Sequence, residues 1–306
     1  MMKTDYTKGP ARTFLGLPEE ACGFQTSRVL ILPIPYDGTA SWRPGARFGP
    51  EAILAASAFV ETYDDELDLV PVGLGFHTLP AVSPTGTGAD AMTERIYGAA
   101  REVLSLAGDR FLLSLGGEHS VTPGLVRAFA ERHEGLSVLH LDAHADLRDS
   151  YEDCRNSHAC ACRRLREHVR NTVSVGVRSL SREEAALIRE EEIPVFFARD
   201  VRVSTDWISA VVDLLGPEVY ITLDLDVFDP SIMPATGTPE PGGLSWHEIV
   251  AVLREVSRRR SVVGADIVEL APVPGNPAPE FLAAKLALKV VTYALEDEIR
   301  GSAGEE

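Results

Sequence analysis

The stretch LSVLHLDAHAD, residues 136–146, is the strongest indication of how this chain folds. Its first six residues are mostly apolar, as in a buried strand, and alternate side chains of a strand point to the same face. Asp142, His144 and Asp146 follow at intervals of two, so their side chains converge if the extended conformation persists. The stretch therefore predicts a buried strand that ends in a cluster of acids and an imidazole.

Two further stretches place polar groups directly after strand-like runs. Residues 219–223 are followed by Asp224 and Asp226, and residues 111–115 by Gly-Gly-Glu-His-Ser at 116–120. The two glycines predict a tight strand-to-helix turn that carries His119 toward the same crevice. Thr122 and Pro123 are the predicted N-cap and first residue of the next helix.

Short apolar runs alternate with helical periodicity along the whole chain. The runs lie at 28–33, 111–115, 136–141, 172–177, 195–198, 219–223 and 261–267, and helical spacing lies at 94–107, 123–132, 182–191, 206–215, 245–259 and 281–298. Ser245 and Glu248 form a predicted capping box. The alternation predicts an α/β fold, a three-layer αβα arrangement with a mainly parallel central sheet. With no internal repeat and no long linker, residues 1–306 are expected to form a single domain.

Composition and charge exclude several classes of function. The chain has 306 residues, of which 45% are hydrophobic, enough for a sizeable core. Its formal net charge of −17 argues against a nucleic-acid surface and suits the attraction of small cations. No apolar run approaches the roughly 20 residues that span a bilayer, so no membrane insertion is expected. Cysteine spacing indicates no disulfide framework and the N-terminus no signal peptide, which favours a reducing, cytoplasmic setting.

The three polar stretches together indicate a site for two metal ions. Carboxylates buried side by side repel one another and raise one another's pKa unless a cation neutralises them. Oxygen-rich ligation with two imidazoles and no thiolate favours a harder ion such as Mn²⁺ over a structural zinc. One such stretch alone is more often an N-cap, a turn or an ion pair. Three of them at strand ends favour the metal site, because open parallel sheets bind ligands at the carboxyl ends of their strands.

These motifs resemble those of the ureohydrolases, the family that contains arginase and agmatinase. The residues that carry the resemblance are SLGGEHS (114–120), LDAHAD (141–146), TLDLDVFDP (222–230), GTPEPGG (237–243) and GADIVEL (264–270), with RPGARFGP (43–50) also typical. The resemblance covers most of the chain and implies an arginase-like fold. A set of five motifs is far more specific than one short motif.

The resemblance implies two Mn²⁺ ions per subunit and a hydrolytic mechanism. The implied ligands are His119, Asp142, Asp146 and Asp224 for one ion and Asp142, His144, Asp224 and Asp226 for the other, with Asp142 and Asp224 as bridges. Two ions that share a water present hydroxide at neutral pH, which would attack a guanidinium carbon. Asp146 is then expected to accept the hydroxide proton and to pass it to the leaving amine.

Two further residues are expected to serve the substrate. Glu269 would hold the guanidinium through charge-assisted hydrogen bonds, which it could make with both oxygens. His158, in the loop after the second motif, is the candidate proton shuttle because imidazole titrates near neutral pH. The common family pattern has His-Gly here, whereas this chain has His158-Ala159.

Several other polar residues admit plainer interpretations. A zinc site of His158 with Cys154, Cys160 and Cys162 matches no standard spacing, and the thiols fit buried apolar residues better. His140 is predicted to be a hydrogen-bonded core histidine rather than a ligand. Asp266 and Asp229 are candidates for orienting ligands from behind, with a turn role an equal alternative for Asp229.

Loops are expected to decide the substrate, because the ligands specify only the guanidinium end. Arginases have an Asn-rich stretch after the second motif, where this chain has Leu147-Arg148-Asp149-Ser150-Tyr151. The motif GTPEPGG resembles that of agmatinases. The expected function is therefore agmatinase: manganese-dependent hydrolysis of agmatine to putrescine and urea.

The alternatives are a guanidinobutyrase, a guanidinopropionase, an arginase or a non-catalytic guanidino-compound binding protein. A metallophosphoesterase is disfavoured because its companion motifs are missing. Arg148 would favour a carboxylate substrate if it faced the pocket, but we expect it to pair with Asp149 or Glu152. The expected partners are a small cationic guanidino substrate and further copies of the chain, in the trimer or hexamer that the resemblance implies.

Overall fold

The computed structural model describes residues 4–10, 12–201 and 206–303. In this part of the chain an eight-stranded sheet runs in the order β2-β1-β3-β8-β7-β4-β5-β6, and every neighbouring pair is parallel. The strands are β1 Val29–Ile34, β2 Phe76–Thr78, β3 Phe111–Gly116, β4 Ser137–Leu141, β5 Thr172–Val177, β6 Val195–Phe197, β7 Glu218–Asp224 and β8 Ser261–Val268. The α-helices are α1 Gly49–Ser57, α2 Ala89–Ala107, α3 Thr122–Ala130, α4 Ala161–Leu165, α5 Arg182–Glu190, α6 Ala198–Val201, α7 Trp207–Leu214, α8 Trp246–Arg259, α9 Ala278–Ala294 and α10 Glu296–Ala303.

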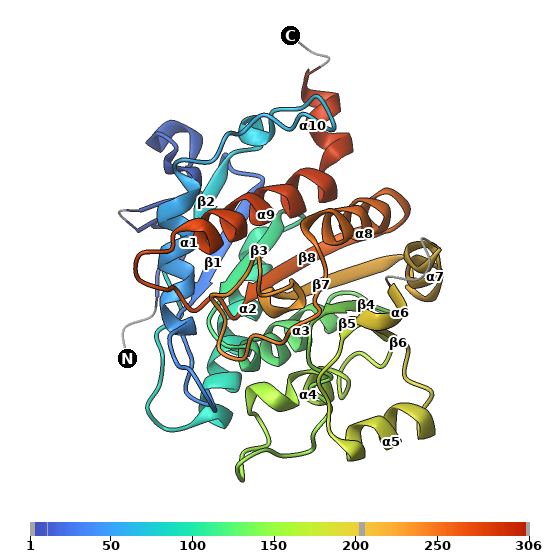
Figure 1. The fold of residues 1–306 in the computed structure, drawn as a ribbon. Coiled ribbons are helices and arrows are strands. Elements are labelled where there is room, and N and C mark those ends of the chain that lie inside the picture. The colour runs from blue at the N-terminus through green and yellow to red at the C-terminus, as the bar shows by residue number, and fades with distance from the viewer. Residues whose placement is uncertain (1–3, 11, 202–205, 304–306) are drawn as a thin grey trace.

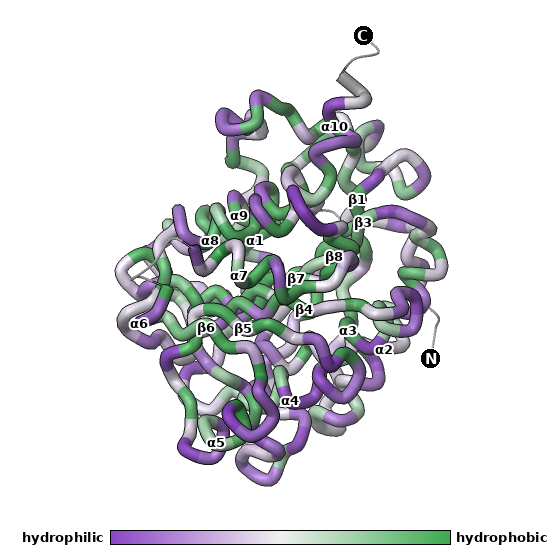
Figure 2. Tube along the Cα trace, turned by 90° about the vertical axis from the view of Figure 1, so that its right-hand side faces the viewer, coloured by the Kyte–Doolittle hydropathy of each residue, from purple (hydrophilic) through white to green (hydrophobic). Residues whose placement is uncertain are grey.

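Helices cover both faces of the sheet (Figure 1). Helices α1, α7, α8 and α9 share one apolar core with one face, and α2 and α3 share a second core with the other. Figure 2 shows the strands as a largely hydrophobic band between these helices. The three-layer αβα prediction is confirmed. Strands buried on both faces are apolar throughout, which explains why they were visible in the sequence as continuous runs.

The predicted elements are present, with shifted ends and some omissions. The seven predicted strands correspond to β1 and β3 to β8, whereas β2, a three-residue strand at the sheet edge, and the helices α1, α4 and α6 were not predicted. The helix predicted over 281–298 begins earlier and is two helices, because Leu295 leaves helical geometry (φ −118°) between α9 and α10. A proline in the first turn of α9 is compatible with the earlier start.

The central four strands carry the polar stretches on their carboxyl ends. In space they are ordered β3-β8-β7-β4, although their order along the chain is β3, β4, β7, β8. His119 follows β3, Glu269 follows β8, Asp224 ends β7 and Asp142 follows β4. Parallel strands place all four carboxyl ends at one edge of the sheet, so these residues meet there.

The turn after β3 is built differently from the prediction. A Cβ on Gly117 would lie 1.8 Å from the carbonyl oxygen of Tyr36, so only glycine fits there. A 3-10 turn, His119–Val121, follows, and α3 begins at Thr122 itself. The predicted N-cap role of Thr122 is therefore wrong. Its hydroxyl lies 3.3 Å from that of Thr222 in the core instead.

Two helices begin with reciprocal capping boxes. The predicted box of Ser245 and Glu248 opens α8, and both of its hydrogen bonds are present. A second box, not predicted, opens α5 with Ser181 and Glu184. Each box satisfies backbone N–H groups that a helix start leaves unpaired.

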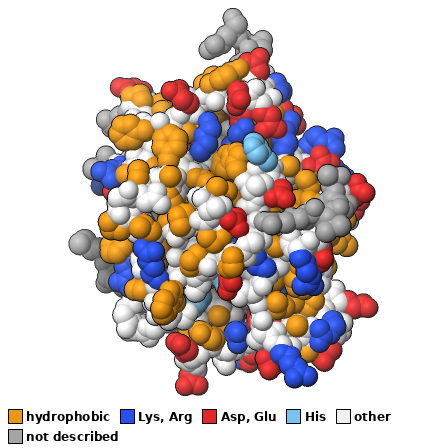
Figure 3. Space-filling model, viewed as in Figure 1, with side chains coloured by type: hydrophobic (Ala, Val, Ile, Leu, Met, Phe, Trp, Pro, Cys, Tyr) orange, Lys and Arg blue, Asp and Glu red, His pale blue; other side chains and the backbone are white. Residues whose placement is uncertain are grey.

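The surface carries mixed charges. On the face shown in Figure 3, acidic side chains are scattered among basic and apolar ones rather than gathered in one patch. Across the described residues no helix combines the length and apolar character that crossing a bilayer would require.

Candidate metal centre

The second motif converges as predicted, but by another backbone path. Strand β4 ends at Leu141, and Asp146 adopts a left-handed conformation with φ +51°. The carbonyl oxygen of Asp146 accepts a hydrogen bond from the Arg163 amide at 2.8 Å, which helps hold this turn. The extended conformation therefore does not persist to Asp146. Left-handed non-glycine residues are costly and cluster at functional sites, and Glu269 is another here, with φ +68°.

The third motif turns sharply after β7. Residues Leu225–Val227 form a 3-10 turn, and the Asp226 amide donates to Asp224 Oδ1 at 2.9 Å. The turn carries Asp226 toward the second motif, where Asp226 Oδ2 lies 3.0 Å from His144 Nδ1. Asp226 Oδ1 accepts a hydrogen bond from the Ala143 amide at 3.1 Å. The tertiary fold thus joins two motifs that lie about eighty residues apart in sequence.

All six predicted ligands lie together. His119 Nδ1 is 2.9 Å from Asp142 Oδ2, 3.2 Å from Asp224 Oδ2 and 3.6 Å from Asp146 Oδ2. Two groups of described residues have ligand atoms within 4.8 Å of one another: His119, His140, Asp142 and Asp146 in one, and Asp142, His144 and Asp226 in the other. Asp142 belongs to both groups, which is the geometry a bridging carboxylate requires. Asp224, the second predicted bridge, belongs to neither group, although its Oδ2 lies beside His119 Nδ1.

The spacing of these atoms fits metal ions. His119 Nδ1 and Asp142 Oδ2 are buried 2.9 Å apart, yet neither has a hydrogen-bond partner among the described residues. Two ligand atoms at ~2.1 Å from one ion and at right angles lie ~3.0 Å apart, with their lone pairs aimed at the ion rather than at each other. The unpartnered pair therefore has the arrangement of two ligands of a common cation.

The pKa shifts of the clustered side chains also favour a bound cation. Burial and the charges of Asp226 and Asp142 raise the pKa of Asp224 well above its usual range. Burial and the charge of Asp142 raise the pKa of Asp146 to about 8. Burial alone would lower the pKa of His119, but Asp142 and Asp224 outweigh it and raise that pKa. Without a cation the cluster must take up protons, and divalent ions would replace them.

A buried chain of hydroxyls supports His119 from behind. His119 Nε2 lies 3.0 Å from Thr222 Oγ1, and Thr222 Oγ1 donates to Asp266 Oδ1 at 2.6 Å. The hydroxyl of Tyr220 donates to Asp266 Oδ2 at 2.8 Å. The predicted orienting role of Asp266 is thus supported and passes through Thr222, which sequence reasoning did not identify. Asp229 instead accepts backbone hydrogen bonds from Ser231, Gly242 and Gly243 and organises a turn.

His140 is a fully buried histidine whose ring contacts Asp142 of the cluster. Its Nδ1 lies 3.1 Å from Ser174 Oγ and its Nε2 lies 2.9 Å from Asp142 Oδ2. Burial lowers its pKa, but Cys162 and Asp142 raise it to about 10.

Neither candidate metal group of the described residues contains a cysteine. Cys160 and Cys162 are buried, as predicted for apolar thiols, and Cys154 is half-buried.

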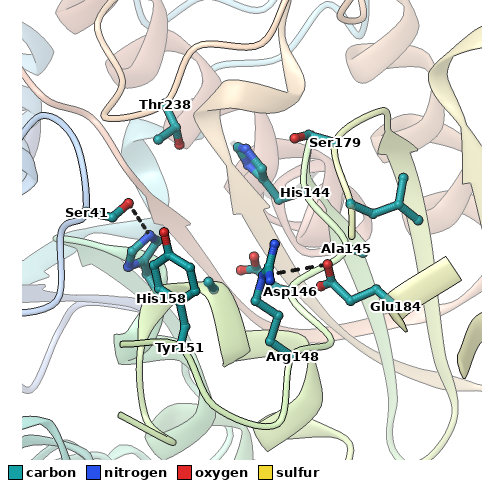
Figure 4. Close-up of a pocket in the computed structure, with 12 residues that line it drawn as sticks. Ser41, His144, Ala145, Asp146, Arg148, Tyr151, His158, Ser179, Glu184 and Thr238 are labelled. Atoms are coloured by element: carbon teal, nitrogen blue, oxygen red, sulfur yellow. Dashed lines mark hydrogen bonds and ion pairs between the residues drawn. The ribbon is translucent and has the colours of Figure 1, made fainter. Parts of the chain in front are cut away.

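A cavity of about 210 Å³ opens beside the cluster (Figure 4). Of the six candidate ligands, His144 and Asp146 line it. The other lining residues are Ser41, Ala145, Arg148, Tyr151, His158, Ala159, Ser179, Leu180, Glu184 and Thr238. A substrate in this cavity would therefore reach the cluster at the side chains of His144 and Asp146.

His158 faces this cavity. Its Nδ1 lies 3.2 Å from Thr39 Oγ1, its backbone amide donates to the same hydroxyl at 2.9 Å, and Ser41 Oγ lies 3.4 Å from Nε2. Burial, and then the charge of His144, lower the pKa of His158 to about 4. The imidazole is therefore neutral near pH 7, whereas the proton-shuttle prediction assumed that it titrates near neutral pH.

Glu269 lies behind the first motif rather than on the cavity wall. Its Oε1 accepts a hydrogen bond from the His119 amide at 2.6 Å, and burial, then Glu118, raise its pKa well above the usual range. Its Oε2 lies 3.7 Å from the position of a Cβ on Gly237, next to Thr238, which does line the cavity. Oε1 thus already accepts one hydrogen bond, and Oε2, which lies nearer the cavity wall, is the oxygen better placed for a guanidinium.

Arg148 faces the cavity. The prediction that it pairs with Asp149 or Glu152 is wrong. Its Nε lies 3.8 Å from Glu184 Oε2, whereas Asp149 pairs with Arg155 and Arg164. Glu184 is close because it is the third residue of α5, which the sheet places beside the second motif. The pattern Ser-x-x-Glu at 181–184 could have predicted that a helix begins here with Glu184 in its first turn, but not that Glu184 contacts Arg148.

Comparison with known proteins agrees with this geometry. The model of the arginase family matches residues 27–292. An N(1)-aminopropylagmatine ureohydrolase of Synechocystis sp. is 40% identical over 94% of this chain and 95% of its own length, and an agmatinase of Pyrococcus horikoshii is 37% identical over 86% and 90%. The crystal structure of the agmatine ureohydrolase of Thermoplasma volcanium superposes with a TM-score of 0.84 at 28% identity, covering 94% of this chain and 97% of that one. The chain belongs to the arginase family of ureohydrolases.

Proposed function

We propose that this protein hydrolyses the guanidino group of agmatine, releasing urea and putrescine, with two Mn²⁺ ions per subunit. The observation that carries the proposal is the convergence of the six predicted ligands beside a cavity in an arginase-family chain, with Asp142 common to both candidate metal groups. The relatives named agmatinase support agmatine as the substrate.

N(1)-aminopropylagmatine is the second candidate substrate. Relatives of that name are 38–40% identical to this chain, compared with 34–37% for those named agmatinase. The two substrates share the guanidino group and a cationic tail and differ in tail length. The chemistry proposed for the metal end is the same for both.

The residues that would hold the ions are the six of the cluster: His119, Asp142, His144, Asp146, Asp224 and Asp226. When bound, two divalent ions supply a hydroxide from a shared water at neutral pH. Asp146 both belongs to the cluster and lines the cavity, so its carboxylate can hold the proton released there and deliver it to the leaving amine. Glu269 Oε2 is the proposed acceptor for a guanidinium N–H.

His158 has a second proposed proton-handling role. Its ring faces the cavity and is hydrogen-bonded by hydroxyls on both nitrogens, which fixes its orientation. As a shuttle, the imidazole would take a proton from solvent and pass it to the leaving amine, which departs as an ammonium. We also propose that the chain is a single domain that assembles into a trimer or hexamer. Mass photometry of the purified protein tests the assembly.

The test is a urea-release panel with manganese-loaded protein. We expect the highest kcat/KM for agmatine or N(1)-aminopropylagmatine among those two compounds, arginine, 4-guanidinobutyrate and 3-guanidinopropionate. Protein stripped by a chelator should lose turnover and regain it with Mn²⁺. Highest specificity for arginine or a guanidino acid would refute the proposed substrate, and release of no urea from any compound would refute the hydrolase.

A further inference from the structure

The outer end of the cavity, where the side chain of Arg148 is exposed to solvent, contains an acid and a base that the hydrolysis described above does not use. Glu184 and Arg148 line the wall beside Asp146, and Figure 4 shows them joined by an ion pair. Among the described residues that line the cavity, Asp146 and Glu184 carry the carboxylates and Arg148 carries the guanidinium. The tail of a substrate whose guanidino group is at the metal centre would meet this pair.

Glu184 is a fixed acceptor. Its side chain is 4% exposed, yet it lines the cavity. Oε1 accepts from the Leu147 amide at 2.8 Å and Oε2 accepts from the Ser181 amide at 2.7 Å. Each carboxylate oxygen has two lone pairs, so one acceptor position per oxygen remains after these bonds. The carboxylate is thus oriented by the backbone and can still bind a cationic group.

Arg148 is held much less firmly. Its side chain is 39% exposed, and its partners among the described residues are Glu184 Oε2, at the long distance of 3.8 Å, and the ring of Tyr151, 5.2 Å from the guanidinium carbon. It donates no hydrogen bond to the described residues. An ion pair that long and partly exposed contributes little, so the guanidinium can move away from Glu184 at low cost.

We infer that Glu184 binds the cationic group at the tail of the substrate, and that Arg148 is a displaceable cation in the same place. A tail ammonium would replace the loose guanidinium and gain hydrogen bonds to a fixed carboxylate. A tail carboxylate would be repelled by Glu184 and attracted by Arg148. The pair therefore selects the tail by its charge. This inference rests on the proposed function and names the residues that choose among its substrates.

The first test removes the charge of Glu184. In Glu184→Gln we expect KM for agmatine to rise about tenfold or more, because hydrogen bonds to a charged partner are lost. KM for 4-guanidinobutyrate should fall, and kcat for both should stay within about twofold, since the pair is outside the reacting atoms. Glu183→Gln is the matched control, because Glu183 is the exposed neighbour on the same helical turn.

The second test removes the charge of Arg148, which is exposed enough that the variant should fold. In Arg148→Gln we expect KM for agmatine to fall about two- to fivefold and KM for 4-guanidinobutyrate to rise by a similar factor. Arg155→Gln is the control. Arg155 is also exposed and ion-paired, to Asp149 and Glu167, and does not line the cavity.

The outcomes separate this inference from the proposed function. If the wild type releases urea but neither variant changes the ratio of the two KM values relative to its control, the inference is wrong and the hydrolase stands. If the wild type releases no urea, calorimetric binding of putrescine and 4-aminobutyrate still decides: weaker putrescine binding in Glu184→Gln supports the inference, and unchanged binding overturns it. If Glu184→Gln does not fold, the Arg148→Gln ratio decides alone.

Discussion

The inner and outer ends of the cavity are built on different principles. At the inner end, side chains from neighbouring strand ends are almost all buried and contact several partners each, as Asp142 does with His119, His140 and His144. At the outer end, Arg148 and Glu184 come from a loop and a helix start and share one long ion pair. The strand ends thus hold the cluster to which we assign the reaction, whereas elements attached to the sheet hold the pair to which we assign the choice of substrate.

The largest effect expected concerns the residue common to both metal groups. Asp142→Asn keeps the shape but removes a charge at the inner end, so we expect loss of bound manganese and at least about a hundredfold loss of kcat. Metal content by elemental analysis and urea release measure the two effects. Asp149→Asn, an exposed acid in the following loop, should change neither. Full metal content in Asp142→Asn would contradict the shared-ligand role.

The support behind His119 should matter next most. Thr222→Val removes the hydroxyl between His119 and Asp266, and loss of such a support typically weakens metal affinity about ten- to hundredfold. Chelator competition with manganese measures this directly. Thr292→Val is the control, because Thr292 is equally buried but bonds Leu288 on α9. Equal metal affinity in the two variants would show that the inner end does not depend on this chain of hydroxyls.

The pH dependence of metal binding is a milder test of the same region. Because the pKa of Asp146 is raised from its ordinary value of 3.8 to about 8, the metal-free folded protein holds a proton between these pH values that the unfolded chain does not. This contribution to stability is fully present below pH 3.8 and is lost as pH rises through about 8. Because the ion displaces the proton, manganese affinity should rise by up to about tenfold per pH unit between pH 6 and 8.

Chelator-treated protein unfolded in urea across this pH range gives the stability, and calorimetry in two buffers gives the protons released. Asp146→Asn, which cannot titrate there, should flatten the stability profile. A wild-type profile as flat as that of the variant would contradict the protonated state of the metal-free cluster.

The smallest expected effect sharpens the contrast at the outer end. Ser181→Ala removes the hydroxyl of the α5 capping box and should lower the free energy of unfolding by about 1 kcal/mol. Ser245→Ala should cost a similar amount at α8. Because the Ser181 hydroxyl accepts a hydrogen bond from the Glu184 backbone amide, its loss should loosen the helix start that carries Glu184 and so raise KM for agmatine. Denaturant unfolding and steady-state kinetics of both variants check this. An equal KM in the two would mean that the cap does not position Glu184.

Much of the inner end was predictable, because local spacing encodes it. The runs that became β3, β4, β7 and β8 are mostly apolar, and each ends in or is followed by acids or an imidazole. The details of convergence were not predictable. Asp146 reaches the cluster through a left-handed turn and Asp226 through a 3-10 turn, where strand alternation alone suggested extended backbone. Those turns are set by bonds to residues remote in sequence, such as Arg163 to Asp146.

The outer end was the least predictable part. Arg148 was expected to pair with a neighbour in sequence, but its partner lies 36 positions away on α5. The support of His119 by Thr222 likewise joins positions 103 residues apart. Sequence spacing carries no information on such contacts unless the neighbouring elements are known.

By itself the sequence determined the class of fold, the strands of the sheet's centre and the types of ligand, since burial and period are local properties of the chain. Tertiary structure alone decided that β3, β8, β7 and β4 are neighbours, that Asp142 belongs to both metal groups and that Glu184 faces Arg148. The physical reason is that packing of distant elements, rather than any local preference, brings these groups within bonding distance.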